Sequence, residues 1–193
     1  FSNEVVSKIV SGYGKADVIT ANYMFANIDD IVNFTKSVEA LLSEDGVFVV
    51  ETGYHPEQFN IKMFDYIYHE HFSYFTVGVL AGFLSKCGLE VIDVEKTKPK
   101  GGSIRVISQS CNGKRVVKPS VKEMIANEVV NGVYNVNTYS VFSDSIQKIK
   151  KELITLLSSI KNEGASIVGL GASHSTTTLI YHFELHNFFE YIV

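Results

Sequence analysis

The chain has 193 residues, 46% of them hydrophobic and 20% charged, which is typical of a globular protein with enough chain for one large domain or two small ones. Its formal net charge is −4 and it has no lysine- or arginine-rich run, so the composition argues against a protein that binds the phosphate backbone of nucleic acid. The two cysteines form neither a CxxC pair nor a disulfide framework, and no apolar run approaches the roughly 20 residues that span a bilayer, so we expect a cytoplasmic protein without a membrane segment.

The first predicted elements form a β-α-β unit. Residues 16–22, ADVITAN, are typical of a buried parallel strand. A helix capped at residues 29–30 is expected next, with apolar residues at helical spacing: Ile31, Phe34, Val38, Leu41 and Leu42. It should end at residues 44–46, before a second buried strand at 46–51. The two strands should therefore be parallel and joined by a right-handed crossover.

Two further strands are expected at the edge of this sheet. Residues 77–87 are predicted to be helical, with Gly88 as the stop signal. Residues 89–94 and 103–108 both have the character of β-strands, and a turn-rich, basic stretch separates them. Because the two strands are joined closely, we expect them to pair in the antiparallel sense.

The rest of the chain predicts a second α/β unit. A helix is expected around residues 121–130, and a strongly amphipathic one at 143–162. The apolar stripe of the longer helix consists of Ile146, Ile149, Leu153, Leu156, Leu157 and Ile160. A strand at 165–170 and a helix at 175–184 should follow, and the last residues resemble the start of another strand.

The segment 64–75, FDYIYHEHFSYF, carries the strongest chemical signal. Tyr68, His69, Glu70 and His71 place four polar side chains in consecutive positions. Histidine titrates near neutral pH and suits a general base, and a neighbouring carboxylate can fix its tautomer. A tyrosine hydroxyl can donate to the oxygen of a developing enolate. The motif therefore indicates proton transfer.

Two other interpretations of this segment remain open. Its many aromatic residues are as consistent with core or interface packing as with catalysis. A His-x-His pair on a strand can also bind zinc, but the pattern HExxH fails because Ser73 occupies the position of the second histidine. No further cysteine or histidine lies nearby in the sequence, so we expect no metal in this chain.

A second motif, VGLGASH at residues 168–174, joins a predicted strand to a predicted helix. His174 stands where the dinucleotide fingerprint GxGxxG requires its third glycine, so a tight structural turn is the favoured interpretation. The start of the helix, with Ser173, Ser175 and Thr176, could still bind an anion such as a sugar diphosphate.

Other candidates are identified by their position. Arg105 follows a glycine pair in the run KGGSIR and could contact an anion, although a hairpin-like loop with a surface arginine is at least as consistent with the spacing. Ala21 and Asn22 end the first strand, and residues 52–54 follow the second. Ligands of doubly wound sheets bind beyond the carboxyl ends of the strands.

Five segments together resemble the C-methyltransferases that act on nucleotide-activated 4-keto deoxyhexoses. In family order they are ADVITANYMFANIDD, EDGVFVVETGY, FDYIYHEHFSYF, CGLEVIDVEKTKPKGGSIRV and IVGLGASHSTTTLI. The elements YHEHFSYF and GGSIR are the specific ones. The resemblance covers most of the chain.

The resemblance implies a fold and a division into domains. A whole enzyme of this kind has a cysteine-rich zinc module, a Rossmann-like methyltransferase domain and a C-terminal α/β domain. Residues 1–110 would be the second half of the methyltransferase domain, without its first strands or the glycine-rich loop that binds S-adenosylmethionine. Residues 111–193 would belong to a second, Rossmann-like α/β domain. Zinc is expected only in the absent N-terminal module.

The resemblance also implies roles for residues. His71 would be the base that removes the proton next to the 4-keto group, and Tyr68 and Glu70 would orient or stabilise the enolate. By position, Ala21 and Asn22 are candidates for contact with S-adenosylmethionine. Arg105, His174 and Ser175 are the candidates for contact with the nucleotide sugar. The chain departs from the family at two places: Asn27 stands where members often have histidine, and Ser175 stands near a lysine found in some members.

The function expected from the sequence is therefore S-adenosylmethionine-dependent C-methylation of a nucleotide-activated deoxysugar, with activity only in the intact protein. The alternatives are a non-catalytic module that binds a nucleotide sugar or dinucleotide, and a structural domain for assembly. The chain begins with Phe1 and ends on the apolar run 191–193, which we interpret as cuts through a longer protein. Its first strand should then expose an unpaired edge, so the isolated chain is expected to self-associate or dissolve poorly.

Overall fold

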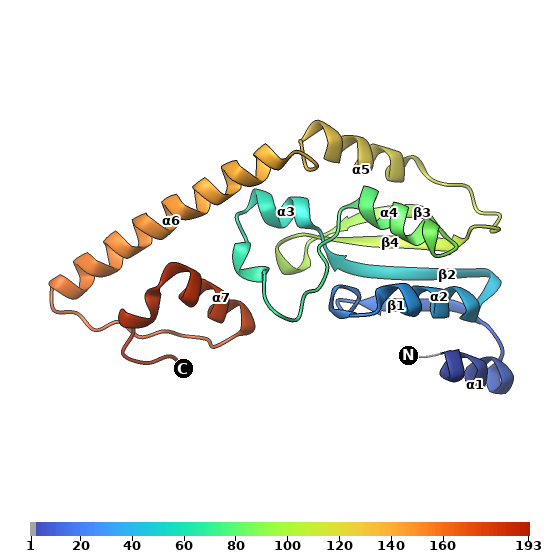
Figure 1. The fold of residues 1–193 in the computed structure, drawn as a ribbon, viewed down its shortest axis with the longest axis horizontal. Helices are drawn as coiled ribbons and strands as arrows, with labels where there is room; N and C mark the ends of the chain where they lie inside the picture. The colour runs from blue at the N-terminus through green and yellow to red at the C-terminus, as the bar shows by residue number, and fades with distance from the viewer. Residues whose placement is uncertain (1–2) are drawn as a thin grey trace. The chain divides into compact units, whose positions relative to one another are not determined.

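A computed structural model describes residues 3–193, which fall into two compact units (Figure 1). The first unit comprises the residues up to Gln58 together with Glu70–Tyr134. The second comprises Phe59–His69 and Asn135–Val193. Residues 59–69 therefore belong to the second unit, although the residues before and after them in the sequence belong to the first.

The first unit is built on a four-stranded sheet in the order β1-β2-β4-β3, whose strands are labelled in Figure 1. The strands are β1 (Ala16–Asn22), β2 (Leu42–Gly53), β3 (Leu89–Thr97) and β4 (Ser103–Ser110). β1 and β2 are parallel, whereas β4 pairs with β2 and with β3 in the antiparallel sense. The predicted parallel unit and antiparallel pair are both confirmed, as is the α/β fold class. The burial predicted for the first strand is wrong: only Ala21 of β1 is buried, because β1 lies at the end of the strand order and pairs with β2 alone among the described residues.

Helices complete the first unit. They are α1 (Asn3–Tyr13), α2 (Ile31–Leu41), α3 (His55–Asn60, which continues into the second unit), α4 (Val77–Lys86) and α5 (Pro119–Val130), with 3₁₀ turns η1 (Phe25–Asn27) and η3 (Pro99–Gly101). Asp30 caps α2, accepting a hydrogen bond from the amide of Asn33 at 3.1 Å, as residues of this type do at helix starts. Thr76 caps α4 in the same way.

The predicted boundary between α2 and β2 is wrong by several residues. The helix ends at Leu41, and Leu42 already has extended backbone angles and pairs with Ala16. Leu42 is 3% exposed and belongs to the core. Burial of this side chain against the sheet therefore overrides the turn signal that follows in the sequence.

The core of the first unit lies between the sheet and its helices. Phe25 is fully buried, and four aromatic rings surround it at centroid distances of 5.5 to 6.4 Å: Phe34, Phe48, Phe75 and Phe83. Aromatic contacts of this kind add to the burial of apolar surface. They join η1, α2, β2 and α4 in one packed layer.

Residues 111–134, assigned by the sequence to the second domain, lie in the first unit. The reason is that Val121 and Met124 of α5 are part of the core beside the sheet. Glu128 of α5 also accepts hydrogen bonds from the amides of Val77 at 2.6 Å and Gly78 at 3.0 Å, at the start of α4. Apolar and polar contacts both attach α5 to α4 and β3.

The second unit contains the helices α6 (Val136–Asn162) and α7 (His174–Phe183), with η2 (Phe64–Tyr66) and η4 (Leu185–Asn187). Both long helices were expected, but α6 begins earlier than predicted because Asn135 caps it, and Figure 1 shows it as one unbroken helix. Four buried residues form the core of this unit: Ile146, Leu157, Phe183 and Leu185.

The strand predicted at 165–170 is not formed as a regular strand. Gly169 instead makes an isolated parallel bridge with Ile192, supported by short backbone bonds on either side. Leu170 is 92% exposed, so this apolar run is not buried among the described residues and lacks the packing that a longer strand requires. α7 connects the two bridged segments, which makes a minimal β-α-β arrangement.

No helix within residues 3–193 combines the length and the apolar character needed to cross a bilayer.

Candidate active site

The carboxyl ends of β1 and β2 meet at one edge of the sheet, where Asn22 pairs with Glu51. Tyr23 follows with a positive φ of 52°. Its amide donates to the carbonyl of Glu51 at 2.7 Å, and its hydroxyl donates to the Glu51 carboxylate at 3.1 Å. A bulky residue in this left-handed conformation is uncommon, and such conformations gather at functional sites.

The two cofactor candidates from the sequence differ in what they present at this edge. Ala21 is 2% exposed and its side chain belongs to the core, so only its backbone is available. Asn22 is exposed and keeps its amide group available. The assignment of both residues to S-adenosylmethionine remains a prediction.

Arg105 lies on β4, where it forms ion pairs with two carboxylates. Its guanidinium donates to Glu51 through Nε at 3.2 Å and Nη2 at 3.0 Å, and to Glu95 at 3.4 Å. Burial opposes ionisation of Glu51, but hydrogen bonds from Arg105, Tyr23 and Thr97 outweigh it and hold the pKa of this carboxyl below its usual value. An anion would therefore meet an arginine whose charge is already compensated.

The sequence analysis missed Glu51 as a site residue. Glu51 could have been predicted from its position, since it is a carboxylate at the end of a predicted buried parallel strand. Its contacts with residues of β3 and β4 and with Tyr23 after β1 could not be predicted from the sequence.

The stretch after residue 69 is attached to the same edge of the sheet. The amides of Phe72 and Ser73 donate to the carbonyl of Ala26 in η1 at 2.9 and 3.2 Å. Phe75 forms a parallel bridge with Tyr54, just beyond β2. Glu70 and His71 are therefore carried by a loop that is fixed at its following residues.

His71 is half-buried and lies in an aromatic cluster. Its ring meets that of Tyr74 edge to face, with centroids 5.9 Å apart and planes at 82°. Tyr74 also lies 5.8 Å from the ring of His55, the first residue of α3. Desolvation by burial lowers the pKa of His55, which favours its neutral form. The sequence analysis did not identify His55 or Tyr74.

Asn27, in η1 beside this loop, has a buried side-chain oxygen. This Oδ1 has no hydrogen-bond partner within the described part of the chain. Leaving a buried acceptor unpaired costs about 1–3 kcal/mol. A buried acceptor of this kind is a natural contact for a donor group on a ligand.

Tyr68 and His69 belong to the second unit, whereas Glu70 and His71 belong to the first. Within the second unit, the ring of Tyr68 stacks on that of His174 at 5.7 Å and 23°. His69 meets His174 edge to face at 6.0 Å and 83°. These residues line a cavity of about 280 Å³ whose walls are Tyr68, His69, His174, Thr177, Thr178 and Tyr181.

Ser175 lies in the first turn of α7, within a cluster of hydroxyl groups. The Ser173 hydroxyl lies 3.0 Å from that of Ser175 and 3.0 Å from that of Thr176. Ser173 and Thr176 form a reciprocal capping box that fixes the start of the helix. The predicted substrate contacts of His174 and Ser175 are not tested by this geometry.

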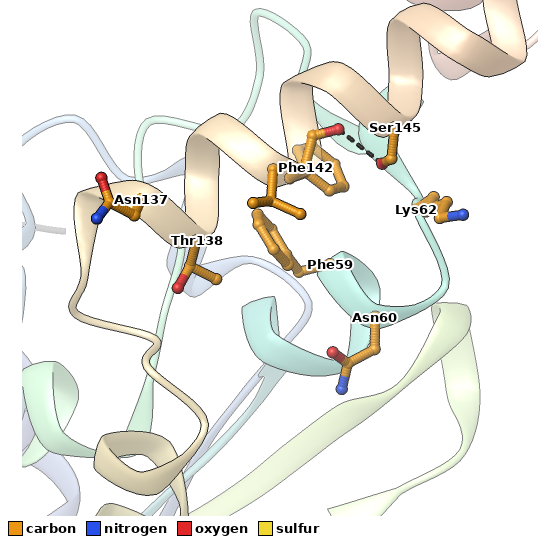
Figure 2. A pocket seen from close by; sticks show the side chains of 8 residues that line it. Phe59, Asn60, Lys62, Asn137, Thr138, Phe142 and Ser145 are labelled. Atoms are coloured by element: carbon orange, nitrogen blue, oxygen red, sulfur yellow. Dashed lines mark hydrogen bonds between the residues drawn. The ribbon is translucent and has the colours of Figure 1, made fainter.

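A larger cavity in the second unit, about 580 Å³ in volume, lies between α6 and the segment before η2 (Figure 2). Its walls are Phe59, Asn60, Lys62, Asn137, Thr138, Val141, Phe142 and Ser145. Figure 2 shows the rings of Phe59 and Phe142 facing each other, with centroids 4.0 Å apart. These walls contain no carboxylate or imidazole, and Lys62 is their titratable side chain.

The second glycine of KGGSIR, Gly102, packs closely against Glu57 of α3. Gly102 has φ of 113°, and a β-carbon at this position would lie 2.5 Å from Cβ of Glu57. Its carbonyl accepts a hydrogen bond from the amide of Tyr54 at 3.1 Å. The close approach expected from the sequence therefore serves the packing of η3 against the start of α3.

No cluster of three or more histidine, cysteine, aspartate or glutamate side chains suited to a metal ion is found among residues 3–193.

Comparison with known proteins supports the family suggested by the sequence. Residues 98–193 match the family described as "C-methyltransferase C-terminal domain". Over 180 residues, 93% of its length, the chain is 34% identical to the C-methyltransferase NovU of Streptomyces niveus. The chain belongs to the C-methyltransferase family. The chain spans 43% of the length of that relative, which is less than half.

Solved structures of methyltransferases are similar to this chain only at a low level. A SAM-dependent methyltransferase from Anabaena variabilis ATCC 29413 has a TM-score of 0.43 and 14% identity, and the match covers 56% of this chain and 55% of that one. The mitomycin 7-O-methyltransferase MmcR has a TM-score of 0.41 and 14% identity, covering 56% and 40%. Assignment to the family therefore depends on the sequence relationship.

Proposed function

We propose that this chain is part of a C-methyltransferase that uses S-adenosylmethionine to methylate a carbon next to the 4-keto group of a nucleotide-activated deoxysugar. Membership of the C-methyltransferase family and the relationship to NovU support the reaction class. The observation that carries the proposal is the half-buried His71, attached through its loop to η1 and to the end of β2.

His71 is the proposed general base. A carbon–hydrogen bond next to a ketone is weakly acidic, and an imidazole with a pKa near neutrality can remove that proton at physiological pH. The electron pair of the broken bond moves toward the keto oxygen and gives an enolate. The Tyr68 hydroxyl would donate a hydrogen bond to that oxygen, and Glu70 would orient the protonated imidazole.

Bound S-adenosylmethionine would supply the methyl group: the nucleophilic carbon of the enolate would take it from the sulfonium as the sulfur–methyl bond breaks, and S-adenosylhomocysteine would leave. The residues at the sheet edge suit such a group. Asn22 presents an amide at the end of β1, and Asn27 has a buried oxygen without a protein donor within the described residues. The task of the protein is to place the reacting carbon and exclude water.

The sugar diphosphate is proposed to bind at two of the predicted positions. Ser175 lies in the hydroxyl cluster at the start of α7, where the helix dipole favours an anion. Arg105 would contribute a donor, although Glu51 and Glu95 share its charge. His174 was predicted to contact the same ligand.

The test uses the intact gene product with S-adenosylmethionine and a nucleotide 4-keto-6-deoxysugar, and mass spectrometry of the sugar. A gain of one methyl group is expected with the native protein, and its loss in His71→Asn while sugar binding is retained. His186→Asn, an exposed histidine of the second unit, is the matched control and should keep full activity. Absence of methylation with several such sugars would reject the proposal and favour a binding module without chemistry.

A further inference from the structure

One face of α7 contacts the segment that leads into the proposed catalytic motif. His174, Thr178 and His182 are spaced four residues apart and therefore lie on one face of the helix. Segment 64–69 contacts this face in reverse order, so that it runs antiparallel to α7.

The contacts are distributed along the whole segment. Phe64 stacks on Phe183 at 4.9 Å and 21°, and lies 5.3 Å from the ring of His182. The Thr178 hydroxyl donates to the carbonyl oxygen of Ile67 at 3.0 Å. Tyr68 then stacks on His174 at the start of the helix.

Each contact fixes a different degree of freedom. Phe183 is 1% exposed and belongs to the core of the second unit, so Phe64 is held by a rigid partner. The Thr178 hydrogen bond fixes the peptide immediately before Tyr68. The nearly parallel stack with His174 fixes the plane of the tyrosine ring, and with it the direction of the hydroxyl.

We infer that His174 is a positioning residue that orients Tyr68 for the reaction, and that it acts through the tyrosine in place of the diphosphate contact predicted from the sequence. The inference depends on the proposed function for its effect on turnover. The stack itself is measurable without turnover. Misplacement of a reacting group by about 1 Å can cost on the order of 100-fold in rate.

The kinetic test compares His174→Ala with His174→Phe in the intact protein. Loss of the ring is expected to lower kcat by about 10- to 100-fold, with KM for the sugar nearly unchanged, because ground-state binding does not depend on the hydroxyl direction. His174→Phe keeps a flat ring and should recover most of kcat. Thr178→Val, which loses only the bond to Ile67, should lower kcat by a smaller factor.

A raised KM in both His174 variants, without recovery by Phe, would overturn the inference and support the diphosphate contact. The second measurement is fluorine NMR of the protein labelled with 3-fluorotyrosine, in which Tyr68→Phe identifies the signal of Tyr68. His174→Ala should shift this signal, whereas the control His186→Ala should not. An unshifted signal in a folded His174→Ala protein would also overturn the inference. If the signal shifts but neither the native protein nor any variant methylates the sugar, the stack between Tyr68 and His174 is supported and the proposed function is rejected.

Discussion

At the scale of single residues, Glu128 places a buried carboxylate in the first unit, where hydrogen bonds must replace its hydration. It is 1% exposed and accepts hydrogen bonds from the Val77 and Gly78 amides and from the hydroxyls of Tyr54 and Tyr134. Burial, followed by the field of Glu128, raises the pKa of Tyr54 above its usual value, so the tyrosine remains a donor. The carboxylate links α5 to the start of α4 and to the end of β2.

Replacement of Glu128 by glutamine should lower the free energy of unfolding by about 3 kcal/mol, because an amide group would face donors that need acceptors. Glu123→Gln is the matched control, since Glu123 is exposed on the same helix and should change stability by less than about 0.5 kcal/mol. Denaturant unfolding of both variants measures the difference. Equal stabilities would show that the Glu128 contacts contribute little.

The residues of the candidate site were predicted unevenly, for a physical reason. His71, Glu70 and Tyr68 are consecutive or nearly so, and their side-chain chemistry is visible in the sequence alone. Glu51 and Arg105 are 54 residues apart and meet only because β2 and β4 pair in this register. Contacts of this kind depend on strand order, which the local pattern does not contain.

At the scale of elements, the turn η3 depends on a glycine. Gly102 has φ of 113° and packs against Glu57, so Gly102→Ala would combine backbone strain with a steric contact. We expect a loss of about 1–3 kcal/mol in the free energy of unfolding.

Gly82 provides the control of opposite sign. It is exposed within α4, and an added β-carbon would meet nothing within 4 Å. Gly82→Ala should therefore raise the free energy of unfolding by about 0.5–1 kcal/mol through helix propensity. Thermal unfolding of the two variants compares them directly, and a stable Gly102→Ala protein would contradict the role given to η3.

The elements that were predicted well have strong periodicity or end signals. The starts of α2 and α4 follow this rule, because a capping residue precedes apolar residues at helical spacing in both helices. Residues 165–170 have an apolar composition without the partners that bury a strand, and they form only a bridge. α5 belongs to the first unit because Val121, Met124 and Glu128 contact residues that are distant in the sequence. No local sequence pattern reveals such contacts.

At the scale of the whole molecule, the carboxylates of Glu51, which is partly buried, and Asp93, which is buried, make stability sensitive to acid. Burial opposes the ionisation of Glu51 and Asp93, but hydrogen bonds from Arg105 and Lys118, respectively, together with further donors outweigh it and lower both pKa values. A carboxyl with a lower pKa in the folded state contributes stability above its unfolded pKa, and that contribution is lost as the pH falls through the folded value.

The free energy of unfolding should therefore decline as the pH falls below the ordinary values of 4.5 for Glu51 and 3.8 for Asp93. A double variant, Glu51→Gln with Asp93→Asn, should be less stable at neutral pH and show a shallower decline in acid. Denaturant unfolding across pH 3 to about 7 measures this. Parallel curves for the two proteins would contradict the assignment.

The open edge of the sheet predicts how the chain behaves in isolation. Among residues 3–193, β1 pairs with β2 alone, and Val18 on this strand is 61% exposed. Unpaired strand edges promote association between chains. Sedimentation of residues 1–193 should therefore show self-association that rises with concentration and weakens in Val18→Lys. A monodisperse monomer would contradict the importance of this edge.

The most direct test of the central claim is deuterium uptake by the sugar in heavy water, with the intact protein and S-adenosylhomocysteine in place of the methyl donor. If His71 removes the proton next to the 4-keto group, the native protein should introduce one deuterium at that carbon, and His71→Asn should introduce none above the uncatalysed rate. Equal exchange by the native protein and His71→Asn would contradict the account, because the base would then be another group.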